Sequence, residues 1–221
     1  MRYNQNEIYL DIIEELDTIV DKHGMTVSSE VSGFIVANSK LSGVPDLALS
    51  FLDPGLIDDC SFHPCVRYNR FERDKVVSFV PPDGIFELMR YRVNSRGPIA
   101  APCSCQPIIT FDGNKGTVLV TAECRQNSSL LFPDNKKPAN FVIDVVITIP
   151  FSRNVKTANL NVTAGIILFD ESSKIAKWNI GKLAGETFPQ LTGNIILNNI
   201  AVGDEVPSIE MDWKVSYTAV F

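Results

Sequence analysis

The run VVSFVPPDGIFELMRYRV, residues 76–93, sets two apolar stretches on either side of a Pro-Pro-Asp-Gly centre. Proline fixes its own φ angle and lacks a backbone N–H, so a sheet ladder cannot continue through Pro81 and Pro82. Asp83 and Gly84 then favour a turn, because glycine adopts positive φ without strain. The pattern predicts a corner without chemistry, whose flanking strands pair as a hairpin and bury Phe79, Phe86, Leu88 and Met89.

Most of the remaining chain also has the pattern of β-strands. In NFVIDVVITI (140–149), the side chains of Phe141, Ile143, Val145, Ile147 and Ile149 alternate with the others, which predicts a half-buried strand. Further β-rich runs are GTVLVTAEC (116–124), NVTAGIILFD (161–170), GNIILNNIAV (193–202) and IEMDWKVSYTAVF (209–221). Turn signals such as DGNKG (112–116) and FPDNKKP (132–138) separate them. Many strands at short intervals, without alternating helices, favour a β-sandwich.

One segment does not fit this pattern. In IYLDIIEELDTIVDKHG (8–24), apolar residues at 8, 12, 16 and 19 fall at helical spacing, and Gly24 could end a helix. Periodicity alone therefore favours a helix there.

The composition of the sequence changes at NSRGPIAAPCSCQP (94–107), which has three prolines and little periodicity. We interpret it as a connection between two lobes or sheets.

Charge and composition exclude several classes of function. The formal net charge is -6, which argues against nucleic-acid binding and weakens any claim of tight attachment to anionic lipid. A local basic run, RYNRFERDK (67–75), is interpreted as a solvated face. There is no basic stretch followed by an apolar one at the start, and no apolar run long enough to span a bilayer. These features favour a cytosolic location.

Candidate chemistry is sparse. Only one cluster of metal-ligand types is present: Cys60, His63 and Cys65, with Cys103 and Cys105 as further candidates. Its spacing matches no standard zinc pattern. Five cysteines at uneven spacing also make a poor disulfide framework, so buried free thiols are the preferred interpretation. No nucleophile elbow or phosphate-binding glycine loop is present, and we therefore expect no catalytic site, no metal and no cofactor.

Four stretches together carry a resemblance to a known family: NEIYLDIIEELD (6–17), LSGVPDLALSF (41–51), DDCSFHPCVR (58–67) and VSFVPPDGIFELMRYRV (77–93). Weaker matches are IPFSRNV (149–155) and WNIGKLAG (178–185). In this order along nearly the whole chain, they resemble the mu homology domain of the medium subunits of clathrin-associated adaptor complexes. Within that family the likeness is strongest to the mu subunits of adaptor complex three, because PDLALSF is followed closely by DDCSFHPC.

The resemblance implies an elongated all-β protein of two β-sandwich subdomains. Residues 1–5 would be a linker remnant, residues 6–97 subdomain A, and residues 98–221 subdomain B with the start of a return strand. It also implies that residues 7–13 form a strand, against their helical periodicity. Both ends look truncated by comparison with the family: a longin-like domain is expected before the chain, and about two further strands after it.

The family's work is cargo sorting in vesicle transport. Its members bind cytosolic tails that carry a Tyr-x-x-Φ signal, where Φ is a bulky apolar residue, by adding the peptide as an extended strand. Carried over by position, Tyr9 would pack on the signal's ring and Asp11 would accept a hydrogen bond from its phenol, because residues two apart share one face of a strand. Leu10 would line the Φ pocket, and Asn38 stands where some members have a basic residue.

Three functions stay open at this point. The first is a cargo-recognition module that acts with other adaptor subunits on the cytosolic face of Golgi, endosomal or vesicle coat membranes. The second is a scaffold-only coat subunit, because the expected further strands carry much of the family's pocket, and this chain alone should then bind Tyr-x-x-Φ peptides poorly. The third is a metal-dependent β-sandwich enzyme that uses Cys60, His63 and Cys65.

Overall fold

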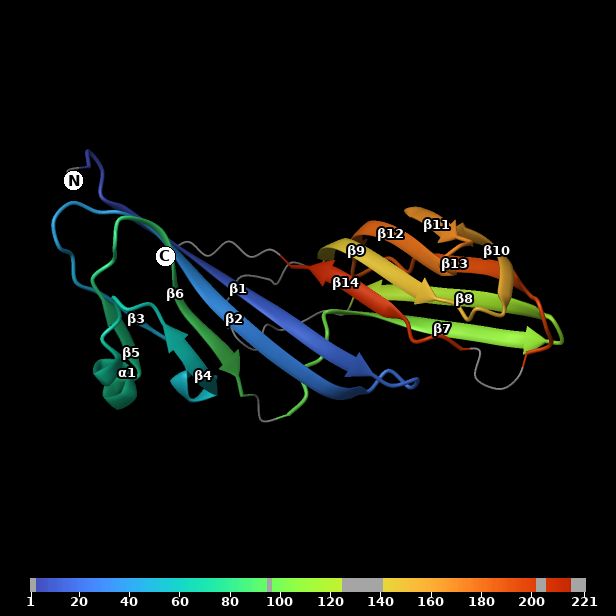
Figure 1. The fold of residues 1–221 in the computed structure, drawn as a ribbon, viewed down its shortest axis with the longest axis horizontal. Helices are drawn as coiled ribbons and strands as arrows, with labels where there is room; N and C mark the ends of the chain where they lie inside the picture. Colours follow the sequence, from blue (N-terminus) through green and yellow to red (C-terminus); the bar gives the residue numbers. More distant parts are fainter. Residues whose placement is uncertain (1–2, 95–96, 125–140, 202–205, 216–221) are drawn as a thin grey trace. The chain divides into compact units, whose positions relative to one another are not determined.

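The computed structural model describes residues 3–94, 97–124, 141–201 and 206–215. It divides into two compact units, which we call unit 1 (residues 1–100) and unit 2 (residues 101–221). Both are built almost wholly from antiparallel β-strands, as Figure 1 shows. The all-β prediction is therefore confirmed, and each unit has its own buried hydrophobic cluster.

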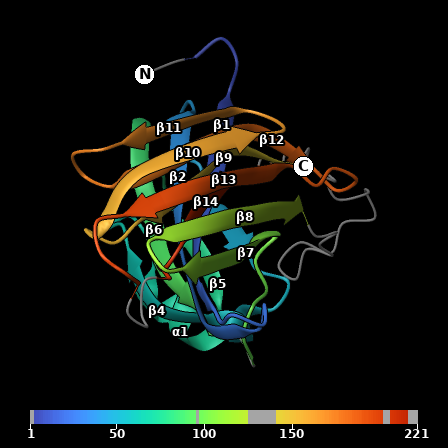
Figure 2. The same ribbon diagram turned by 90° about the vertical axis from the view of Figure 1, so that its right-hand side faces the viewer.

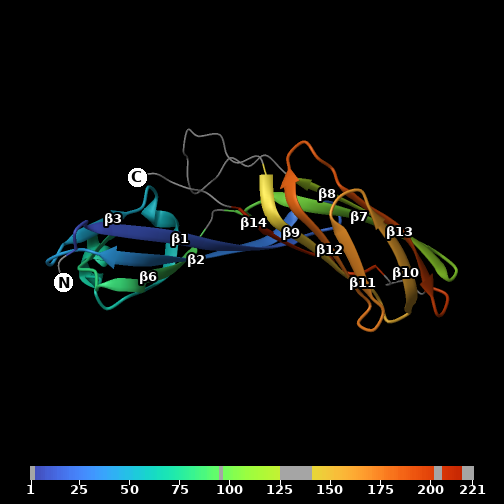
Figure 3. The same cartoon turned by 90° about the horizontal axis from the view of Figure 1, so that it is seen from above.

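Unit 1 is organised around a four-stranded sheet in the order β1-β2-β6-β4. Its strands are β1 (Glu7–Val20), β2 (Thr26–Lys40), β6 (Gly84–Val93) and β4 (Ile57–Phe62). A small sheet pairs β3 (Leu47–Ser50) with β5 (Val76–Phe79), and the short helices are η1 (Pro54–Leu56) and α1 (Tyr68–Asp74). In Figure 3, β1 lies on the outside of the large sheet, with β2 and then β6 beside it.

The strand implied for residues 7–13 is present and extends to Val20. It pairs with β2 along its whole length, from Glu7 opposite Lys40 to Val20 opposite Thr26. Burial along β1 alternates, so even-numbered residues such as Ile8 and Ile12 pack on the core of unit 1. The helical spacing was misleading because pairing with a second long strand satisfies the backbone and turns Ile8, Ile12 and Leu16 towards the core, whereas Ile19 is 65% exposed.

The Pro-Pro-Asp-Gly run forms a corner, but its flanking strands do not form a hairpin. β5 pairs with β3, whereas β6 joins the large sheet between β2 and β4. Two successive prolines keep the chain extended and carry it from one sheet to the other instead of turning it back. Gly84 has the expected positive φ, of 92°. The core prediction is confirmed for Phe79, Leu88 and Met89, which are buried, and Phe86 packs against the same cluster.

The basic run 67–75 contains a helix that its pattern did not predict. Tyr68–Asp74 forms α1, whose Phe71 side chain is buried against Phe62. The guanidinium groups are solvated as expected: Arg67 pairs with Asp46, while Arg73 pairs with Asp74. Lys75 ends the helix in the left-handed conformation, and its N–H bonds to the Phe71 carbonyl.

The core of unit 1 holds a polar contact beneath the sheet. The Tyr91 hydroxyl donates a 2.8 Å hydrogen bond to Glu14, whose pKa is raised by burial. Gly33 lies opposite both residues in the sheet, and a Cβ atom there would come within 2.4 Å of the Tyr91 ring. Glycine at position 33 therefore leaves the room that the tyrosine ring occupies.

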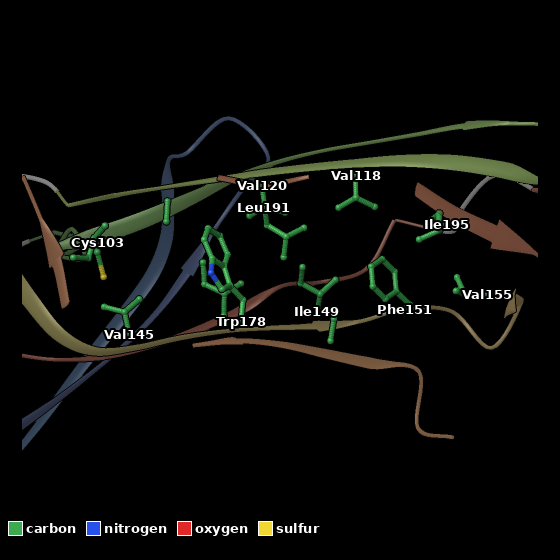
Figure 4. Close-up of a cluster of buried hydrophobic side chains, with 14 of the residues drawn as sticks. Cys103, Val118, Val120, Val145, Ile149, Phe151, Val155, Trp178, Leu191 and Ile195 are labelled. Atoms are coloured by element: carbon green, nitrogen blue, oxygen red, sulfur yellow. The ribbon is translucent and has the colours of Figure 1, made fainter. Parts of the chain in front are cut away.

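In its described residues, unit 2 consists of two four-stranded sheets. One has the order β10-β13-β8-β7 and the other β11-β12-β9-β14 (Figure 2). The strands are β7 (Cys103–Asp112), β8 (Lys115–Cys124), β9 (Phe141–Pro150), β10 (Val155–Val162), β11 (Ile166–Asp170), β12 (Ile175–Ala184), β13 (Gln190–Leu197) and β14 (Glu210–Lys214). Figure 4 shows Val118, Val120 and Leu191 from the first sheet facing Trp178 and Ile149 from the second. The Trp178 indole N–H bonds to the Ala164 carbonyl at 2.9 Å.

The alternation predicted for residues 140–149 is interrupted. The β9 strand exists, but Asp144 has a φ of +53° and the pairing with β12 shifts around it. Val142 is therefore buried in place of Phe141 and Ile143, while Val145, Ile147 and Ile149 face the core as predicted. β7 begins at Cys103, inside the stretch 94–107 that was interpreted as a connection. The turn predicted at residues 132–138 and the end of the β-rich run, residues 216–221, lie outside the described residues.

Candidate functional site

Tyr9 and Asp11 lie on the exposed side of the unit 1 sheet, which we call the outer face. Tyr9 is 56% exposed, and Asp11 is exposed beside it. The Tyr9 hydroxyl donates to the Glu7 carboxylate at 3.2 Å, and this contact raises the pKa of the phenol. The spacing of two therefore places both side chains where one ligand could meet them, as expected for a strand.

Asn38 lies directly opposite Tyr9, on the neighbouring strand β2. Next to Asn38 on β6 comes Ile85, which is 75% exposed. Side chains on directly opposed residues of an antiparallel pair have Cβ atoms about 5 Å apart. Tyr9, Asn38 and Ile85 therefore form a row across three strands: an aromatic ring, an amide and an aliphatic group.

Leu10 points to the opposite side of the sheet from Tyr9 and Asp11. It is half-buried and packs against the hydrophobic cluster of unit 1. Successive side chains of a strand face opposite sides, so a ligand on the outer face cannot meet Leu10 and Tyr9 together. Leu10 is accessible only to a group that reaches around the edge of the sheet.

The edge of the sheet beside the site is open along β1. Within the described residues, β1 pairs with β2 and no other strand lies on its second side. An edge strand presents N–H and C=O groups that an extended chain can pair with. The strand has 14 residues, so it offers room for a peptide several residues long.

The outer face is acidic along β1 and charge-balanced elsewhere. Glu7, Asp11, Glu15 and Asp17 share this face of β1, and the strand has no lysine or arginine. The arginines of β6 already have acidic partners. Arg90 bonds to Glu87 and lies 5.0 Å from the Phe34 ring centre, and Arg92 pairs with Glu30 and Asp59.

The adaptor complexes medium subunit family matches residues 1–220. This chain belongs to that family. The mu subunit of the AP-3 complex from Dictyostelium discoideum is 41% identical over 224 residues, which cover 100% of this chain and 51% of that protein. Other AP-3 mu subunits in the comparison are 35–40% identical, so the likeness to the adaptor complex three members is confirmed. The chain spans about half the length of the curated relatives it matches.

Solved structures show the same fold. The mu homology domain of yeast delta-COP-I superposes with a TM-score of 0.64 at 16% identity, covering 96% of this chain and 82% of that one. The Fcho1 mu homology domain from Danio rerio, bound to an Eps15 peptide, gives 0.65 at 12% identity, covering 93% and 83%. The mu homology fold predicted from the four sequence stretches is thus confirmed.

Membership of the medium subunit family sets the third alternative aside. Medium subunits are trafficking components and not enzymes. His63, one of the suggested ligands, has other contacts: its ring packs against Phe86 in a tilted arrangement with the ring centres 5.0 Å apart, and its Nδ1 accepts a 3.2 Å hydrogen bond from the Cys65 N–H. Cys60 and Cys65 lie in unit 1, whereas Cys103 and Cys105 lie in unit 2. Among the described residues no group of three metal-ligand side chains comes together.

Sequence reasoning about this medium subunit domain missed Ile85 as a neighbour of the site. Because Phe86 was expected in the core, its neighbour Ile85 could have been placed on the opposite, outer face of the strand. Only the register between β2 and β6 brings Ile85 beside Asn38. Ile13 is a second exposed apolar residue on the outer face, two positions beyond Asp11. No helix in the described part of the chain is long and apolar enough to cross a membrane.

Proposed function

We propose that this chain is a cargo-recognition module of a vesicle-transport adaptor and binds Tyr-x-x-Φ signals in cytosolic tails. The observation that supports this most strongly is the exposed pair Tyr9 and Asp11 on an edge strand, with Asn38 opposite Tyr9. Membership of the medium subunit family agrees with such a role. The chain would reach the cytosolic face of Golgi, endosomal or vesicle membranes through its adaptor complex.

The chemistry of recognition follows from the two side chains. The Asp11 carboxylate accepts a hydrogen bond from the phenol of the signal, and hydrogen bonds to charged groups are among the stronger ones in proteins. The Tyr9 ring packs against the ring of the signal. Backbone groups along β1 pair with the extended peptide, which fixes its direction and spacing. No bond is made or broken.

Binding by these residues alone is expected to be weak. Asn38 offers an amide where a basic side chain would bring positive charge, and the arginines of the outer face are engaged by their own acidic partners. The face around Asp11 is thus negative overall. A signal with a free phenol should therefore bind this face better when the residues that flank it are neutral or basic than when they are acidic.

Peptide titration tests the proposal. A fluorescent Tyr-x-x-Φ peptide is titrated with wild type, Asp11→Ala and Asp17→Ala, the last being a matched control on the same strand and face. We expect Asp11→Ala to weaken binding about tenfold or more, because a hydrogen bond to a charged group is lost. Asp17→Ala should stay within about twofold of wild type, like most surface substitutions.

A second peptide isolates the phenol contact. Replacing the signal's tyrosine with phenylalanine should weaken binding to wild type and have no further effect on Asp11→Ala, since the two changes remove the same hydrogen bond. Equal losses in both proteins, or equal effects of Asp11→Ala and Asp17→Ala, would contradict the proposed role of Asp11.

The scaffold-only function is the second candidate, and the arginines of β6 favour it, because Arg90 and Arg92 are paired with carboxylates of the chain itself. In that case the chain contacts other adaptor subunits and no cargo; the similar AP-3 mu subunits are themselves parts of a complex. Pull-down of adaptor large subunits by wild type and Asp11→Ala separates the two functions. Retention of large subunits, with no peptide binding by wild type, would support the scaffold.

A further inference from the structure

The β7–β8 hairpin brings two cysteines opposite each other. Gly113 and Asn114 form its loop, and the strands pair without a register shift from Asp112 opposite Lys115 to Cys103 opposite Cys124. Cys103 is the first residue of β7 and Cys124 the last of β8. The pair therefore closes the open end of the hairpin.

The position of Pro107 shows which kind of pair this is. Opposed residues in an antiparallel ladder alternate between hydrogen-bonded and non-hydrogen-bonded pairs. Pro107 faces Val120 and has no N–H, so that pair is of the non-hydrogen-bonded kind. Cys103 lies four residues away in an unbroken register and is of the same kind. Such pairs have Cα atoms about 4.5 Å apart, inside the range of roughly 4.4–6.8 Å seen in disulfides.

Both side chains face the core of unit 2. Cys103 is 2% exposed and Cys124 is 8% exposed, both belong to its buried cluster, and both are thiols. Figure 4 shows Cys103 at one end of that cluster, with Val145 nearby. Cys105 shares this side of β7 but faces Ala122, so it can reach Cys124 only along the longer diagonal.

We propose that Cys103 and Cys124 form a reversible disulfide modification site that responds to peroxide. One thiol reacts with hydrogen peroxide to give a sulfenic acid and water. The second thiol attacks that sulfur, and a second water leaves as the S–S bond forms. Two thiols are thus oxidised and one peroxide is reduced to two waters.

Burial controls the rate of this reaction. It raises the pKa of the Cys124 thiol and so reduces the reactive thiolate. Both cysteines stand at strand ends, where ladders open most readily, and Cys124 is the more exposed of the two, so it reacts first. A link near the short end of the allowed Cα range is strained, and strained disulfides are reduced more easily, which keeps the site reversible.

Mass spectrometry of the whole chain tests the site. After peroxide treatment under native conditions, remaining thiols are alkylated and the protein is digested with trypsin without reduction. We expect the peptide with Cys103 and Cys105 (97–115) to be joined to the peptide with Cys124 (116–125). The link should persist in Cys105→Ala, the matched control, and disappear in Cys103→Ala and Cys124→Ala.

A stability measurement gives an independent check. Closing the end of the hairpin constrains the unfolded chain, so oxidation should raise Tm of wild type and Cys105→Ala by a few degrees, and a reductant should reverse the shift. If Cys103→Ala does not fold, Cys103→Val takes its place. The proposal fails if the link runs through Cys105, or if both thiols stay reduced at peroxide levels that oxidise glutathione fully.

Discussion

Glu14 is a carboxyl group held against the core of unit 1 by a tyrosine. Desolvation is the main cause of its raised pKa, and the hydrogen bond from Tyr91 opposes it only in part. The folded chain therefore binds the Glu14 proton more tightly than the unfolded chain does. The stability of unit 1 should fall as the pH rises from the unfolded pKa through the raised one.

Replacing Glu14 with glutamine tests whether stability falls as the pH rises. Glutamine keeps an oxygen that can accept from Tyr91 and cannot ionise, so Glu14→Gln should be more stable than wild type at pH 7. The advantage should shrink towards pH 4, where Glu14 is protonated. Urea unfolding between pH 4 and 7 measures both, with exposed Glu15→Gln as the neighbouring control. A constant difference across the range would contradict this account.

The two pocket candidates show what residue patterns can and cannot supply. Spacing alone places Tyr9 and Asp11 on one face of a strand, once the segment is known to be a strand. The position of Asn38 opposite Tyr9, and of Ile85 beyond it, depends on pairing between strands far apart in the sequence. No local pattern determines that register, so Ile85 was missed.

At the scale of elements, irregular strands explain most differences from the sequence analysis. β6 contains an extra residue: Ile35 faces Met89 while Val36 faces Glu87, so Leu88 is inserted between them and both Leu88 and Met89 are buried. Asp144 in β9 has a similar effect. Bulges reset the alternation without changing composition, so the sequence predicts the strands but not which face each residue takes.

The short strand β5 is buried on both faces. Val77, Ser78 and Phe79 are all fully enclosed, and the Ser78 hydroxyl has no hydrogen-bond partner among the described residues. A buried hydroxyl without a partner loses its hydration and gains nothing in return. The polar side chain at this position therefore weakens the element.

We accordingly expect Ser78→Ala to stabilise the protein by about 1 kcal/mol, because it removes the unsatisfied hydroxyl. Thermal unfolding followed by circular dichroism measures the change, and exposed Ser28→Ala on β2 serves as the control. A loss of stability in Ser78→Ala that exceeds the effect in the control would show that the hydroxyl has a stabilising contact.

At the scale of the whole molecule, the two units have separate cores. Trp178 is buried in unit 2 and bonds to the Ala164 carbonyl, whereas the core of unit 1 is built from residues such as Ile35 and Phe79. The overall β class could be predicted from the alternating runs and the turn signals between them. The division of strands between sheets could not, because it depends on long-range pairing that a corner such as Pro-Pro-Asp-Gly does not specify.

Trp178→Ala should therefore destabilise unit 2 by about 3–5 kcal/mol, as large core truncations do. The amide hydrogens of unit 1 should stay protected from exchange, since unit 1 has its own hydrophobic cluster. Hydrogen exchange measured on individual peptides distinguishes the two units. Faster exchange is expected in β9 and β12 of unit 2, and unchanged exchange in β1 and β2 of unit 1. Equal acceleration in β1 would show that the units unfold together.

The row of carboxylates on β1 has a consequence for the chain in concentrated solution. Two copies that met edge to edge would bring Glu7, Asp11, Glu15 and Asp17 of one close to the same groups of the other. Like charges at such distances repel, which protects an open strand from stacking into fibrils. The same edge stays available to a positively charged segment of another protein. The carboxylates therefore oppose pairing between two copies of this chain and permit pairing with a basic peptide.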